Sequence, residues 1–204
     1  WYIVTRPALN DGSSTPWFAS YWTFIAAYLN DRYGDDYCLS FEASLHLHTG
    51  ATVVPAQLVI IANTKGTQKL NLPFDTSLLI YQDANNFPTG RMLVHNLWIM
   101  DLPTALCKAS PSYFRQNAAD AELALRMVRD SSEILRVLLA GGRSAVAGRL
   151  AGAYAFLGEA IMSERIVRDM AASGYPIKPT NPFVNEAPFL TSGVRVQSPY
   201  IARI

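Results

Sequence analysis

Residues 38–63 read CLSFEASLHLHTGATVVPAQLVIIAN, and this stretch decides the fold. Ser40 is a good helix N-cap, and Glu42 follows in the first turn, where the helix dipole favours an anion. The helix that they predict ends at Gly50. Residues 53–62 are rich in β-branched side chains and alternate little, which indicates a strand that is buried on both faces. The stretch therefore predicts a helix, a turn and an inner strand in succession.

Two histidines, His46 and His48, stand in this helix and raise the question of a metal site. Side chains two positions apart on a helix point about 200° apart, so the two rings cannot hold one ion together. His95 is the only other histidine of the sequence, and no acidic residue near it completes a ligand set. We predict that one ring packs in the core, that the other points outward, and that no metal or other cofactor is bound.

The flanking segments add a second early helix and further strands. Thr15 followed by Pro16 is a good pair for the N-cap and the first helical position. Apolar side chains then fall on nearly every face, which predicts a helix deep in the core. Residues 78–81 and 92–99 are predicted strands, and residues 102–108 are a predicted short helix.

The second half of the chain is predicted to be helical. An amphipathic stripe indicates one long helix from Asp120 to Ala140. Ser144 and Ser163 are the predicted N-caps of two further helices, and Gly174 ends the last of them. After Gly174 the sequence is rich in proline, which is typical of an extended linker.

These patterns predict an α+β (mixed α/β) protein. A small mixed β-sheet with two N-terminal helices is followed by an α-helical half and an extended proline-rich tail. We expect an α/β domain at residues 1–110, a helical subdomain at 111–175 and a linker at 176–204. Because the sequence begins with Trp rather than Met and ends without a cap or polar tail, we expect a fragment of a longer protein.

The composition limits the classes of function. The chain has 17 basic and 16 acidic residues and a formal net charge of +1, which argues against a strongly cationic nucleic-acid platform. Its cysteines, Cys38 and Cys107, give neither a disulfide framework nor a Cys-x-x-Cys motif, which suits a reducing cytoplasm. No apolar run reaches the roughly 20 residues that span a bilayer. We expect a cytoplasmic protein with no membrane partner.

No catalytic constellation is evident in the sequence. The motifs of phosphate-binding loops, serine hydrolases and zinc proteases are absent from it. The two cysteines have the character of small buried hydrophobic residues. We therefore predict no enzyme activity for this chain and no catalytic or cofactor-binding residue. One alternative is a small enzyme whose site assembles from Cys38, Asp35 and either His46 or His48.

Small residues line one face of the helix that follows Ser144. Gly148 and Gly152 are four positions apart, and Ala145 precedes them on the same face. This spacing lets another backbone approach closely, although each glycine costs about 1 kcal/mol of helix propensity. Ala145, Gly148 and Gly152 are thus a candidate docking face for a partner domain or a second copy. The alternative is ordinary tight packing on the predicted long helix.

Arginines accumulate in the same half of the chain, where acidic residues nearly match them in number. This balance is typical of a solvated, salt-bridged helical surface. A stand-alone nucleic-acid-binding or transcription-regulator module that uses these arginines is the alternative function. The arginines are Arg126, Arg129, Arg136, Arg143, Arg149, Arg165 and Arg168.

The order of these motifs resembles a known family. Residues 39–50, followed by Pro55 and the strand at 57–62, resemble the body domain of AbiEi-type antitoxins, in which a helix, turn and strand follow a winged helix-turn-helix. The chain is more specifically similar to the leading region of Fic-family proteins that carry an AbiEi-like segment. The other matching pieces are residues 1–7, 14–33, 101–114, 134–158 and 174–183.

The resemblance implies a function of bacterial toxin–antitoxin type without catalysis. The Fic loop for AMP transfer, His-x-Phe-x-(Asp/Glu)-Gly-Asn-Gly-Arg, and the inhibitory helix of that family are absent from the sequence, so no active-site residue carries over. The chain would be a regulatory, antitoxin-like module between a winged-helix DNA-binding head and a Fic adenylyltransferase domain. Its expected partners are that downstream domain or a second copy, with DNA bound through the head.

Overall fold

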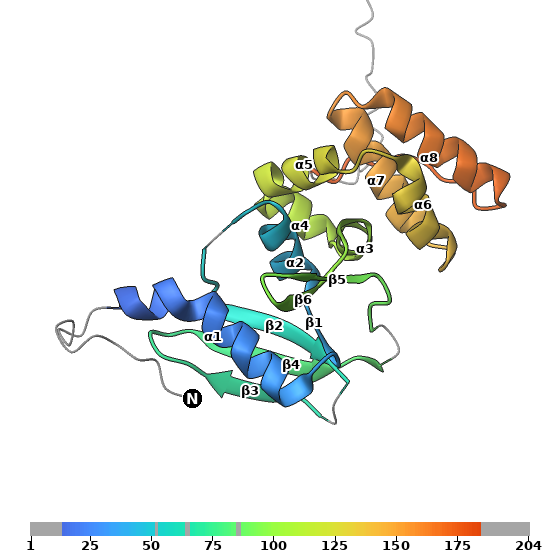
Figure 1. Ribbon diagram of the computed structural model, residues 1–204. Helices are drawn as coiled ribbons and strands as arrows, with labels where there is room; N and C mark the ends of the chain where they lie inside the picture. The colour runs from blue at the N-terminus through green and yellow to red at the C-terminus, as the bar shows by residue number, and fades with distance from the viewer. Residues whose placement is uncertain (1–13, 52, 64–65, 85–86, 185–204) are drawn as a thin grey trace, which may run out of the picture.

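The computed structural model describes residues 14–51, 53–63, 66–84 and 87–184 and has the predicted α+β fold (Figure 1). The strands and the first helix form one half, and the later helices form the other. The elements in chain order are α1 (Thr15–Tyr33), β1 (Tyr37–Leu39), α2 (Phe41–His48), β2 (Gln57–Ala62), β3 (Gln68–Asn71), β4 (Ser77–Gln82), β5 (Arg91–Val94), β6 (Leu97–Met100), α3 (Leu102–Lys108), α4 (Pro111–Gln116), α5 (Ala118–Met127), α6 (Ser131–Leu139), α7 (Ser144–Phe156) and α8 (Ala160–Ala172).

The main sheet is mixed, as predicted, and has the strand order β1-β2-β4-β3. β2 and β4 are parallel, with Ile60 opposite Ile80, and the other neighbouring pairs are antiparallel. β2 begins at Gln57 and not at residue 53, because Val53 is 77% exposed and Pro55 cannot donate to a ladder. β3 was not predicted, since this edge strand has a mostly exposed, polar sequence.

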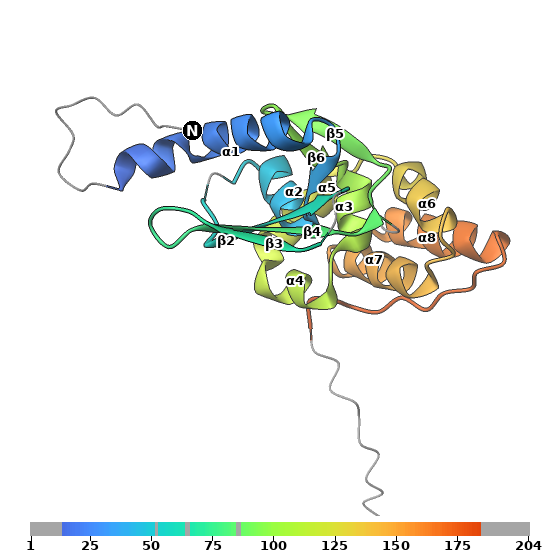
Figure 2. The same cartoon turned by 90° about the horizontal axis from the view of Figure 1, so that it is seen from below.

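The helix α1 is buried on one face only, which corrects the prediction of a helix deep in the core. Trp17, Tyr21, Ile25 and Leu29 recur every four residues and pack on the sheet, whereas Phe18 is 42% exposed. The N-cap is Ser14 and not Thr15, and the helix ends at Gly34 as predicted. The helix has sheet on a single side (Figure 2), so its remaining aromatic rings are only partly covered.

The predicted strand at residues 92–99 is in fact a hairpin. β5 and β6 are antiparallel, with Val94 opposite Leu97. The turn is made by His95 and Asn96, which both have positive φ, 46° and 62°. Tight hairpin turns need this left-handed backbone and usually take glycine there. The turn was missed because the sequence has no glycine at either position.

The predicted long helix from Asp120 to Ala140 is also corrected. It is two helices, α5 and α6, because Val128 is extended and the Asp130 carboxylate accepts a hydrogen bond from the Ser132 N–H (2.9 Å) as a new N-cap. α4 precedes them and was not predicted. α8 begins at Ala160, so Ser163 is a buried residue inside that helix rather than its N-cap.

Two hydrophobic cores share the helix α2. The sheet core is built by α1 and the main sheet, and the helical core by α3–α8. Neighbours on β1 point to different cores, since Tyr37 and Leu39 belong to the sheet core and Cys38 to the helical core. On α2, Ala43 belongs to the sheet core and Leu45 to the helical core. The domain boundary near residue 110 stays a prediction, but α3 already packs with the later helices.

A buried hydroxyl ties α2 to the hairpin. Ser44 is fully buried, and its Oγ donates to the Ser40 carbonyl (2.8 Å) and accepts from the Met100 N–H (3.0 Å). The predicted N-cap of α2 is confirmed, because the Ser40 Oγ accepts from the Ala43 N–H. α2 is therefore fixed at both its start and its centre, between the two cores.

Candidate functional site

The candidate docking face lies on α7, and an extended segment of the same chain crosses it. The Thr180 N–H donates to the Gly148 carbonyl oxygen at 3.0 Å. A Cβ at Gly148 would lie 2.5 Å from the Lys178 carbonyl oxygen, and one at Gly152 would lie 2.6 Å from the Thr180 nitrogen. Ala145, the third residue of the face, is exposed. Docking of a partner on this face stays a prediction, and it would require this segment to move.

We call residues 175–184 the strap. Figure 2 shows it running from the end of α8 beneath α7 towards α4. Near its end, the Phe183 ring packs edge-on against Phe114 (5.7 Å between centroids) and stacks on Phe156 (5.2 Å). Near its start, the Tyr175 ring lies against Gly142, where φ is positive (57°). The strap is therefore held at both ends and in the middle.

The two histidines of α2 each have a separate partner. His46 Nε2 lies 3.5 Å from Asp120 Oδ2, an ion pair when the ring is protonated, and His48 Nε2 lies 2.9 Å from the Met100 carbonyl oxygen. Both residues are half-buried, so the prediction of one core ring and one outward ring was wrong. The reason is the position of α2, which has neighbours on both sides. Within the described residues, no three His, Cys, Asp or Glu side chains form a metal-binding group.

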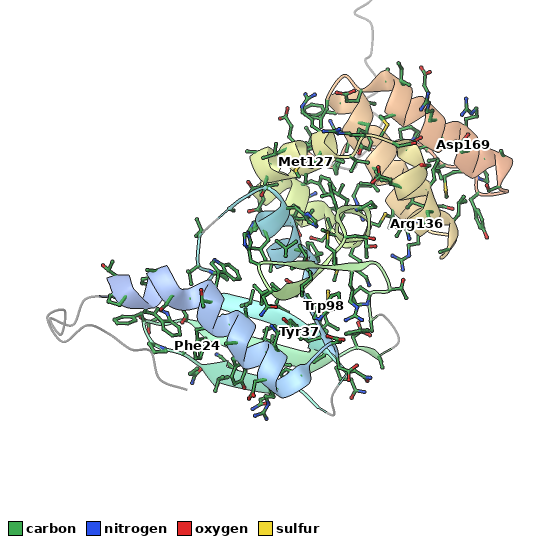
Figure 3. The ribbon with its side chains drawn as sticks, in the orientation of Figure 1. Phe24, Tyr37, Trp98, Met127, Arg136 and Asp169 are labelled. Atoms are coloured by element: carbon green, nitrogen blue, oxygen red, sulfur yellow. The ribbon has the colours of Figure 1, made fainter. Side chains whose placement is uncertain are left out.

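The cysteines are buried, as predicted. Burial raises the pKa of the Cys38 thiol and that of the Cys107 thiol to about 12 each. Asp35, the acid of the alternative enzyme site, instead accepts a hydrogen bond from the Trp98 indole N–H (3.0 Å; Trp98 is labelled in Figure 3). These residues and the histidines thus engage different groups, and the structure gives them no shared site.

Thiol labelling tests this description. At pH 8 a pKa of about 12 leaves roughly one thiol in ten thousand as the reactive thiolate. We expect Cys38 and Cys107 to resist a thiol-specific reagent in the folded protein and both to react rapidly after unfolding in denaturant. Fast reaction of either thiol under native conditions would show that it is accessible and would contradict the burial described here.

Several of the helical arginines are paired with carboxylates. Arg126 contacts both Glu122 and Glu159 at 3.0 Å, and Arg168 contacts Asp169 at 2.8 Å. These pairs have the character of the salt-bridged surface that the sequence indicated. Because the charges of Arg126 and Arg168 are already matched, these two arginines do not support the stand-alone nucleic-acid function.

An apolar cavity of about 460 Å³ lies between α1, the end of α2 and the turn of the hairpin. Its wall includes Trp22, Leu47, His95 and Leu97. The Trp22 indole N–H is buried and has no hydrogen-bond partner among the described residues. No pattern in the sequence predicted this cavity, because it depends on the turn at His95, which was itself not predicted. The described lining residues offer hydrophobic contact and include no carboxylate or cysteine.

The fold and these sites define an α+β protein with two cores and an extended segment bound to its own helical half. In comparisons with known proteins, no family model, no curated protein and no solved structure matches the chain. Over the residues that the structure describes, no helix is long and apolar enough to cross a membrane.

Proposed function

We propose that this chain is a non-catalytic, antitoxin-like regulatory module of a Fic-family protein in the cytoplasm. It connects a winged-helix DNA-binding head to an adenylyltransferase domain, and it positions that domain through the strap. The resemblance of residues 39–62 to AbiEi-type antitoxins suggests these neighbours. The observation that carries the proposed mode of action is the strap, held on α7 by the Thr180–Gly148 hydrogen bond.

Binding of the strap to α7 shortens the free part of the predicted linker. Ten residues of free extended chain would let an attached domain range over about 30 Å. When the strap is bound, the linker is fixed to the helical half as far as the stacked rings of Phe183 and Phe156. Because the predicted linker continues to residue 204, the attached domain then explores a smaller volume than it would with the whole linker free, which raises its effective concentration at surfaces within reach.

The buried thiols are poor candidates for nucleophilic catalysis by this module. A nucleophilic cysteine requires a lowered thiol pKa and must be accessible to its substrate. Burial instead raises the pKa of Cys38 and Cys107. In this proposal the chemistry belongs to the attached domain, and this module sets where that domain acts.

The test measures AMP transfer from labelled ATP to protein. We expect no transfer by these 204 residues alone. In the protein that joins them to the adenylyltransferase domain, Gly152→Ala displaces the strap and should change the transfer rate severalfold. The matched control is Ala145→Gly, an exposed change on the same helix, which should leave the rate unchanged. Transfer by the isolated chain would refute the proposal, and so would equal rates for wild type and Gly152→Ala when loss of protection at the Thr180 amide shows that the strap is released.

A further inference from the structure

A second cavity, of about 390 Å³, lies between the two halves of the molecule. Its walls come from three segments that are distant in the sequence: the loop before β5, α3, and the region where α6 ends and α7 begins. We call it the cationic cavity, because side chains that carry a positive charge or a hydroxyl group line much of it. They are Thr89, Thr104, Lys108, Arg136 and Arg143.

The positive charges at the cationic cavity differ in their partners. Arg136 pairs with Asp101 at 3.4 Å, but its side chain stays 65% exposed. Figure 3 shows Arg136 on the side of α6 that faces the strands. Among the residues that the structure describes, Arg143 forms no salt bridge. The described lining residues include no carboxylate, although Asp101 lies beside them as the partner of Arg136.

The effects of these charges on neighbouring groups agree with this description. Burial lowers the pKa of Lys108, and the charge of Arg143 lowers it further, while Asp83 raises it. Burial raises the pKa of Cys107, whereas Arg143 and Arg149 lower it. The Arg149 Nε is buried and has no partner among the described residues. Asp101 offsets part of the positive charge, whereas Arg143 has no salt bridge among the described residues, so an anion bound beside Arg143 would meet a charge that is not yet paired.

We propose that the cationic cavity binds the phosphate group of a small phosphorylated ligand. Guanidinium and ammonium groups hold phosphate oxygens by charge-assisted hydrogen bonds, and guanidinium groups do so in a bidentate manner. The hydroxyl of Thr104 supplies a neutral donor. The volume is in the usual range for small-molecule sites, and Phe87 gives an apolar wall for the rest of the ligand.

Such a ligand would also join the two halves of the molecule. Arg136 and Arg143 belong to the helical half, whereas Phe87 and Thr89 belong to the loop that leads into the hairpin. A phosphate held between them adds an attraction that neither half has alone. The site is independent of the strap, so its failure and that of the proposed function are distinguishable.

Isothermal titration calorimetry with inorganic phosphate, pyrophosphate and ADP tests the proposal on the 204-residue chain. We expect wild type to bind pyrophosphate, and Arg143→Gln to weaken that binding about tenfold or more, because a charged hydrogen bond is lost. Arg136→Gln, at a more exposed position, should weaken it severalfold without loss of fold. Arg129→Gln removes an exposed arginine outside the cavity and should leave the affinity unchanged.

The outcomes separate the possible ligands. Tighter binding of ADP than of pyrophosphate would support the proposal and assign a nucleotide, and equal affinities would support it and assign the phosphate group alone. No binding of pyrophosphate by wild type would overturn it. The same loss in Arg129→Gln as in Arg143→Gln would also overturn it, since the effect would then be one of net charge. Duplex DNA that displaces pyrophosphate and loses affinity equally in Arg143→Gln and Arg129→Gln would overturn it in favour of a nucleic-acid surface.

Discussion

Replacing Leu45 by alanine should destabilise the whole protein by about 2–5 kcal/mol, the usual range for a fully buried leucine. Leu45 has no exposed surface and lies in the helical core, while Ala43 of the same short helix lies in the sheet core. A cavity at Leu45 loosens α2, and α2 is the element that both cores share. We therefore expect the substitution to weaken the two halves together.

Denaturant unfolding with two probes measures this effect. The three tryptophans that the structure describes, Trp17, Trp22 and Trp98, pack in or against the sheet core, so their fluorescence follows that half, whereas far-UV circular dichroism follows mainly the helical half. We expect the two curves to coincide in wild type and to shift by the same amount in Leu45→Ala. Separate transitions, with only the helical one moved, would contradict a shared helix. Leu123→Ala, at a position 46% exposed, is the matched control and should cost less than about 0.5 kcal/mol.

The elements that the sequence predicted well are those with local signals. Ser40 caps the start of α2 and Gly34 follows the end of α1, each through its own side-chain or backbone chemistry. The start of α3 follows from the N-cap Asp101 and from Pro103 in the first turn. These signals act over a few residues, so they are visible without the rest of the fold. The α+β class follows from the same local patterns.

The elements that were missed depend on tertiary contacts. β3 has a polar sequence and is a strand because β4 offers it a partner. The turn at His95 and Asn96 carries a left-handed backbone without glycine, and the Asn96 carbonyl accepts from the Asn30 side chain of α1 (2.7 Å). The break before Asp130 interrupts an apolar pattern that continues on both sides. None of these can be read from periodicity alone.

For the candidate sites too, local features could be predicted from the sequence, and features that depend on tertiary contacts could not. The spacing of Gly148 and Gly152 indicated that a backbone could approach α7 closely. It did not indicate which backbone would approach, because residues 178–180 lie beyond the next helix, α8, and their sequence has no pattern that predicts the contact. The cationic cavity was not foreseen either, since Lys108, Arg136 and Arg143 come together only when α3 and α6 pack.

Replacing Gly152 by alanine should release the strap from α7. Two effects oppose each other. Alanine favours the helix by about 1 kcal/mol, but its methyl group would collide with the backbone of Thr180, and overpacking of this kind costs about 1–3 kcal/mol. Backbone atoms cannot turn aside as a flexible side chain does, so the strap must move as a unit. We expect global stability to change little and strap binding to be lost.

Hydrogen exchange at the Thr180 amide measures strap binding directly, because this N–H donates to the Gly148 carbonyl. In Gly152→Ala its protection should fall about tenfold or more, which corresponds to 1.4 kcal/mol or more of local opening free energy. Ala145→Gly, at an exposed position, should cost about 1 kcal/mol of helix stability. The protection of the Thr180 amide should stay unchanged when it is compared with that of amides that exchange by global unfolding. If the Thr180 amide kept its full protection in Gly152→Ala, the close approach would not be what holds the strap. The stacking of Phe183 on Phe156 would then be the main contact, and the positioning role proposed for this segment would rest on those rings rather than on the glycines of α7.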